Sequence, residues 1–155
     1  MTTWQARLQH TANLLVGGTG IVYGYMRYFM KPADEWAVVN HPWQPHVQHL
    51  HVLVAPLLVF ACGLIWSRHV AGNLKGNGTR GRRTGPGLLL ALVPMVASGY
   101  LIQTTVTETW RQVWVVTHVV SSVTWIVAFS AHLVQPYLVR LRQRLRQLAT
   151  AERRG

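Results

Sequence analysis

The segment from Trp110 to Val139 constrains this chain most, because it is a long apolar stretch with two histidines in its interior. About 30 residues of helix, rising about 1.5 Å each, are enough to cross a hydrocarbon layer of about 30 Å with some tilt. His118 and His132 lie 14 residues apart in this stretch. That spacing is just under four helical turns, so both imidazoles leave the same face, about 21 Å apart along the axis. One histidine is therefore expected toward each surface of the membrane.

A histidine inside a membrane helix needs either a polar partner or a function. Imidazole is a common axial ligand of haem iron, and two imidazoles on one face predict two stacked b-type haems. The alternative is that each imidazole only forms a hydrogen bond with a neighbouring helix. Matching histidines elsewhere in the chain favour the haem interpretation.

The composition fits a small membrane protein. The chain has 155 residues, of which 50% are hydrophobic and only 12% are charged, a balance typical of a membrane bundle rather than a soluble domain. Its net charge of +11 does not indicate nucleic acid, because the basic residues fall in predicted loops and tails rather than on one folded face. Cys62 is the only cysteine, which excludes a disulfide framework, a cysteine-based metal site and haem attachment through paired cysteines.

The hydrophobic pattern predicts an all-α fold, an integral membrane four-helix bundle. We expect one haem-binding domain over residues 1–139 and a basic cytoplasmic tail over residues 140–155. Arginines alternate with leucines in this tail, a pattern typical of an amphipathic extension that lies on anionic lipid. The predicted membrane helices cover about residues 8–28, 46–69, 87–106 and 110–139.

The first of these helices contains an unusual number of glycines, at positions 17, 18, 20 and 24. They allow either tight helix packing or space for a flat macrocycle, and the sequence alone does not separate the two. No small-residue cleavage site follows this segment, so we interpret it as a retained helix rather than a signal peptide.

The second helix offers three histidines as candidate ligands. His49 and His51 lie about 200° apart around a helix, so at most one of them faces a given haem. Small residues on the face of His51 favour it as the inward one. His69 shares that face but adjoins Arg68 at the predicted helix end, so His69 and His49 are reserve candidates.

Depth along the helices sorts the histidines into two pairs. His51 and His118 lie near the outer ends of the second and fourth helices and are predicted to coordinate the outer haem iron. His10, near the start of the first helix, and His132 are predicted to coordinate the inner haem iron. No catalytic residue is predicted.

The distribution of basic residues predicts the orientation. Of the 15 lysines and arginines, 12 lie on one side of a four-helix topology. They are Arg7 before the first helix, Arg68 at the end of the second, four residues in the loop between the second and third helices, and six in the tail. Positive residues mark the cytoplasmic side. We therefore expect a bacterial inner (cytoplasmic) membrane protein with both termini in the cytoplasm.

These features together resemble a known family. Arg7-x-x-His10 before a glycine-bearing apolar helix, His51 at the start of the second helix, and His118 with His132 on the fourth are similar to the di-haem cytochrome b subunits of membrane-bound hydrogenases and formate dehydrogenases. The resemblance covers residues 4 to 139. It implies the same pairing, His10 with His132 and His51 with His118.

The chain departs from that family pattern at a few positions. Thr11 follows the first histidine where these proteins often have tryptophan, and His49 and His69 are additional. The resemblance also implies a function, the exchange of electrons between a membrane quinone and a periplasmic cytochrome or dehydrogenase subunit.

Two other functions compete with this electron conduit. One is a stand-alone transmembrane reductase of a small molecule or metal ion, and the other is a haem-free membrane scaffold whose histidines serve only in packing. The sequence contains no flavin motif and no predicted soluble domain, so a partner subunit is expected.

Overall fold

The computed structural model describes residues 2–66, 70–72 and 85–152. These residues contain no strand and form four helices, which confirms the predicted all-α class. The helices are α1 (Thr3–Tyr28), α2 (Gln44–Ile65), α4 (Gly85–Thr104) and α5 (Glu108–Glu152).

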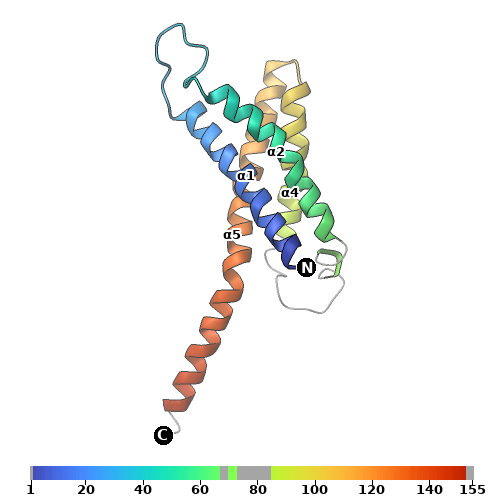
Figure 1. The fold of residues 1–155 in the computed structure, drawn as a ribbon, viewed down its shortest axis with the longest axis vertical. Helices are drawn as coiled ribbons and strands as arrows, with labels where there is room; N and C mark the ends of the chain where they lie inside the picture. Colours follow the sequence, from blue (N-terminus) through green and yellow to red (C-terminus); the bar gives the residue numbers. More distant parts are fainter. Residues whose placement is uncertain (1, 67–69, 73–84, 153–155) are drawn as a thin grey trace. The chain divides into compact units, whose positions relative to one another are not determined.

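The chain divides into two compact units, Met1–Gly76 and Asn77–Gly155. In the first unit α1 packs along α2, and we call this pair the N-terminal hairpin (Figure 1). In the second unit α4 packs along α5, and we call this pair the C-terminal hairpin (Figure 1). Each hairpin is described by itself below.

Three helical segments are long and apolar enough to cross a membrane: Gln44–Ile65, Gly87–Thr104 and Glu108–Ala151. Only 11%, 17% and 11% of their most apolar windows are buried inside the protein. Helices that expose their apolar side chains in this way suit a lipid environment, which confirms the predicted membrane character. α1 is a helix as predicted but is not among these three segments, since it carries Gln5, Gln9, Asn13 and several glycines.

The polar residues of α1 form hydrogen bonds with α2. The Gln5 side-chain amide donates to the Leu64 carbonyl oxygen at 3.4 Å, and the Gln9 amide lies 3.4 Å from the Cys62 sulfur. Such interhelical bonds hold helices together where lipid provides no hydrophobic driving force between them. The Gln9 Oε1 atom is buried and has no hydrogen-bond partner among the described residues.

In the C-terminal hairpin, small and flexible side chains form the packed face of α4. Ala91, Met95 and Ser98 are buried at helical spacings of four and three residues, and they therefore share one face. Ser121 and Trp125 are the buried residues of α5. The side chain of Ser98 is only 1% exposed, so its hydroxyl needs partners inside the hairpin.

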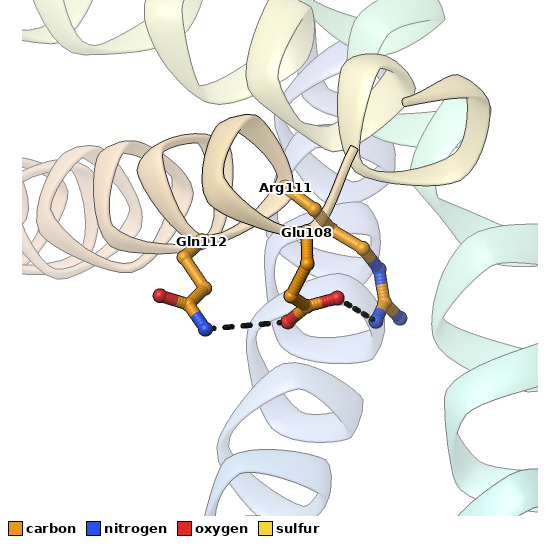
Figure 2. Close-up of polar contacts among 3 residues, drawn as sticks. All are labelled: Glu108, Arg111 and Gln112. Carbon is orange, nitrogen blue, oxygen red and sulfur yellow. Dashed lines mark hydrogen bonds and ion pairs between the residues drawn. The ribbon is translucent and has the colours of Figure 1, made fainter. Parts of the chain in front are cut away.

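Figure 2 shows how α5 begins. The Glu108 carboxylate in the first turn accepts a hydrogen bond from the Gln112 amide at 3.3 Å, and its other oxygen lies 3.7 Å from an Arg111 guanidinium nitrogen. A negative side chain in the first turn also interacts favourably with the helix dipole. These exposed contacts fix the point at which the fourth helix starts.

α5 continues beyond the predicted membrane segment without interruption. Its 45 residues span about 68 Å, more than twice the hydrocarbon thickness of about 30 Å. Figure 1 shows its red end running well past the end of α4. The predicted tail is therefore helical as far as Glu152, and Leu141, Leu145 and Leu148 on it are exposed. Its contact with anionic lipid stays a prediction.

Candidate functional site

In the N-terminal hairpin, the imidazole of His51 packs against α1. Its Nδ1 atom lies 3.1 Å from the Val16 carbonyl oxygen and 3.1 Å from the Thr19 hydroxyl. The ring also covers Gly20 so closely that a Cβ built there would lie 2.9 Å from the His51 Cε1 atom. Only glycine leaves room for this ring position, because real Cβ atoms essentially never approach a neighbour within 3.0 Å.

In the C-terminal hairpin, the imidazole of His118 packs against α4 in the same manner. Its Nδ1 atom lies 2.9 Å from the Met95 carbonyl oxygen and 3.4 Å from the Ser98 hydroxyl. A Cβ built at Gly99 would lie 3.2 Å from the His118 Cε1 atom. The same two ring atoms therefore meet the same three kinds of neighbour in both hairpins.

The two sites share a local sequence pattern. Residues 16–20 and residues 95–99 both consist of an apolar residue, two intervening residues, a hydroxyl residue and a glycine. On a helix the first, fourth and fifth of these positions lie on one face, because the spacings of three and four residues bracket one turn. We call each of these segments, together with the histidine that it holds, a histidine cradle.

The cradles fix the tautomer of their histidines. A carbonyl oxygen can only accept a hydrogen bond, so the Nδ1 atom of each histidine must be the donor. Each cradle hydroxyl donates to the carbonyl four residues earlier in its own helix, and it therefore faces the imidazole as an acceptor. In the neutral imidazole the lone pair then lies on Nε2. This is the arrangement typical of a metal-ligating histidine, whose other nitrogen donates to a backbone carbonyl.

The remaining candidates lie elsewhere on the helices. His49 is exposed and lies on the side of α2 opposite His51. His10 is at an exposed position of α1, and His132 is half-buried on α5. His69 lies outside the described residues.

One face of α1 combines a histidine with open space. Gly17 and Gly24 follow His10 at successive intervals of seven residues, and residues seven apart lie within about 20° of each other around a helix. A Cβ built at either glycine would meet nothing within 4 Å. These two glycines therefore do not serve the close helix contact that Gly20 makes.

One face of α5 also repeats at seven residues. His118, Trp125 and His132 follow each other at this interval within a single helix, so they share a face as predicted. Trp125 is 6% exposed and stacks on Phe129, with ring centroids 6.5 Å apart and planes 5° apart. A rigid aromatic pair thus lies between the levels of the two histidines.

In the part of the chain that the structure describes, no three His, Cys, Asp or Glu side chains come together in a group that could hold a metal ion. An axial pair on haem iron needs two histidines rather than such a group. Comparisons with protein-family models, with curated proteins and with solved structures gave no match.

The sequence-based prediction did not identify the residues that hold the ligand candidates. The third predicted helix contains no histidine, and yet its Ser98 and Gly99 contact His118 directly. The signal was present as the repeated pattern of residues 16–20 and 95–99. A five-residue pattern is too short to stand out in the sequence alone. It becomes meaningful only because the structure places a histidine against each of the two segments.

Proposed function

We propose that this protein is a membrane di-haem cytochrome b that passes electrons between the quinone pool and a periplasmic redox partner. The observation that carries the proposal is the pair of cradles. In each of two hairpins a histidine donates Nδ1–H to a backbone carbonyl, the hydrogen bond that commonly orients a metal-ligating imidazole. This contact recurs against the same five-residue pattern in both hairpins.

The donor set fits the outer b-type haem. His51 and His118 are the proposed axial ligands, and in the neutral form each would offer Nε2 while Nδ1 donates to a backbone carbonyl. Their pairing is supported by the similar depth of the two residues in their helices and by the family resemblance. Gly17 and Gly24 of α1 are open positions, which suits the alternative that glycines in this helix provide space for a flat macrocycle.

His10 and His132 are the proposed ligands of the inner haem. His132 lies about 21 Å from His118 along one helix, which places the two proposed sites at different depths. The pairing with His10 is supported by its position near the start of α1 and by the resemblance to cytochrome b subunits. The two haems would then share α5 and take their other ligands from α1 and α2.

Bound haem supplies one-electron redox chemistry at iron. Oxidation of a quinol to a quinone releases two electrons and two protons, so the electrons would pass singly to the periplasmic partner and the protons would leave separately. The chain's own contribution is to hold the four histidines at two levels and to surround them with apolar helices. A bacterial inner membrane with both termini in the cytoplasm is the proposed setting, on the charge distribution given above.

The decisive experiment is a visible spectrum of the detergent-solubilised full-length protein with a measurement of haem per chain. We expect reduced b-type bands and two haems per chain. Absence of haem after expression with ample haem supply would refute the proposal and would support a haem-free scaffold.

A second experiment separates the conduit from a stand-alone reductase. The haem-loaded protein is reduced with a quinol, and reoxidation is measured with and without proteins that co-purify from the native membrane. We expect rapid reoxidation only with a co-purified periplasmic redox protein. Equally rapid reoxidation by a small molecule or metal ion alone would favour the reductase.

A further inference from the structure

We infer that the cradle hydroxyls of Thr19 and Ser98 are positioning residues that set the reduction potential of the outer haem through its two ligands. This inference rests on the proposed function, because it concerns the donor strength of His51 and His118 as ligands. It goes beyond that function by assigning a tuning role to two residues that touch neither the haem iron nor a substrate.

The hydroxyls are aimed at the imidazoles by their own helices. The Thr19 hydroxyl donates to the Leu15 carbonyl at 2.7 Å, and the Ser98 hydroxyl donates to the Pro94 carbonyl. Each hydroxyl oxygen therefore presents its lone pairs to the Nδ1–H group of the histidine, at 3.1 Å for Thr19 and 3.4 Å for Ser98. Each Nδ1–H group is shared between this hydroxyl and a backbone carbonyl.

A second acceptor on Nδ1–H changes the ligand on the opposite nitrogen. Hydrogen-bond acceptors at the outer nitrogen raise the basicity of a metal-bound imidazole. A more basic imidazole stabilises ferric iron more than ferrous iron, and the reduction potential is lower as a result. Removing a cradle hydroxyl should therefore raise the potential of the haem that the histidine holds.

The geometry also predicts the order of the effects. The Thr19 contact is 0.3 Å shorter than the Ser98 contact (3.4 minus 3.1 Å), and its backbone carbonyl is farther from Nδ1, at 3.1 Å against 2.9 Å for Met95. The hydroxyl thus carries a larger share of the hydrogen bond in the N-terminal cradle. Loss of the Thr19 hydroxyl should have the larger effect.

The test uses the full-length, haem-loaded protein and the variants Thr19→Val, Ser98→Ala and the double variant. Valine preserves the branched shape of threonine, and the backbone carbonyl still holds each imidazole. Thr124→Val and Ser121→Ala are matched controls, because among the described residues both hydroxyls bond only carbonyls of their own helix. Thr19→Ser and Ser98→Thr retain the hydroxyl and serve as rescue variants.

The readout is a spectroelectrochemical titration that resolves the two haem components. We expect one component to shift upward by about a threefold change in the ferrous-to-ferric ratio in Thr19→Val, which is about 28 mV at 59 mV per tenfold change for one electron. The shift should be smaller in Ser98→Ala, should add in the double variant, and should fall on the same component. The rescue and control variants should keep both potentials.

Several results would overturn the inference. These are unchanged potentials in both variants, a shift of different components by the two variants, equal shifts in the controls, or loss of haem from Thr19→Val and Thr19→Ser alike. Loss of haem from Thr19→Val with retention in Thr19→Ser supports a hydroxyl that acts on the ligand. A wild-type protein that binds no haem refutes the proposed function itself. If the protein binds haem but its potentials do not change in the Thr19 and Ser98 variants, only the tuning role is refuted.

Discussion

Gly20→Ala tests the N-terminal cradle by filling it with one methyl group. The added Cβ would lie 2.9 Å from the His51 Cε1 atom, whereas ordinary contacts begin at 3.4 Å. The ring must therefore retreat, and it reaches ordinary contact after about 0.5 Å (3.4 minus 2.9 Å). Its Nδ1 contacts are already 3.1 Å long, so a retreat of this size takes them to the limit of a hydrogen bond.

Three free-energy terms set the expected change in stability. Overpacking costs about 1–3 kcal/mol, and the weakened hydrogen bond costs about 0.5–1.5 kcal/mol more. Against these, alanine gains about 1 kcal/mol over glycine within a helix. Gly18→Ala is the matched control, because a Cβ there meets nothing within 4 Å among the described residues and Gly18 lies off the face of His10, Gly17 and Gly24. We expect Gly20→Ala to be less stable than Gly18→Ala by about 2–4 kcal/mol.

The assay is equilibrium unfolding of the full chain in mixed micelles with increasing denaturing detergent, followed by helical circular dichroism, with haem per chain measured on the same samples. Gly20→Ala should unfold at lower detergent fraction and lose about one haem. Gly99→Ala should be milder, because its Cβ would lie 3.2 Å from His118. Equal stability and equal haem content in Gly20→Ala and Gly18→Ala would refute the description of the cradle.

Other predictions address orientation, ligand choice and packing. A reporter fused after Gly155 should be cytoplasmic and one inserted in residues 34–44 should be periplasmic, since basic residues mark the cytoplasmic side. The opposite result would exchange the predicted depths of the two haems. His51→Ala should reduce the haem content from two to one per chain and His49→Ala should keep both haems, since His49 is exposed on the other side of α2; the reverse pattern would move the ligand to His49. Gln9→Leu should leave the unfolding midpoint unchanged or raise it by the equivalent of about 1 kcal/mol, because it removes a buried oxygen that has no partner among the described residues. A clear loss of stability would show that the contact with Cys62 matters more.

The helices were predictable because the length and apolar composition of a segment are enough to identify a membrane helix. Three of them meet that standard in the structure, and each of the four predicted segments overlaps one helix, although the third was predicted to reach Val106 and α4 ends at Thr104. The helical tail beyond Val139 was expected only from the alternation of arginine and leucine, and α5 extends through it to Glu152. A lipid-facing helix needs little more than a hydrophobic surface, so composition suffices.

The cradles were not predictable in the same way, because they depend on which residues meet across a hairpin. The sequence offered glycines in the first helix with two interpretations, close packing or open space. In the structure the glycines differ. A Cβ built at Gly20 would clash with His51, whereas a Cβ built at Gly17 or Gly24 would meet no described atom within 4 Å. The register that decides this is set by interhelical contacts such as that of Gln9 with Cys62, and no local pattern reveals it.

The same register bears on the inner haem. Gly20 lies opposite His51, and Gln9 lies opposite Cys62, so the level of each α1 residue on α2 is fixed. His10 lies ten residues from Gly20 along α1, which places it about 15 Å from the level of His51. The corresponding separation of the two histidines on α5 is about 21 Å.

Depth alone therefore does not choose the partner of His132. The axial distance from the level of His51 to His10 is about 6 Å shorter than the roughly 21 Å between His118 and His132. For His69 the corresponding distance on a continuous helix is about 27 Å, which is about 6 Å longer. His10 is favoured on other grounds, since it shares its face with the two open glycines and matches the first-helix ligand of the cytochrome b subunits that the chain resembles. We predict that His10→Ala loses the inner haem and interrupts electron flow between quinol and partner, whereas His69→Ala keeps both haems. Haem analysis and quinol-dependent reduction of the two variants decide between them, and retention in His10→Ala with loss in His69→Ala would place all four ligands on the second and fourth helices.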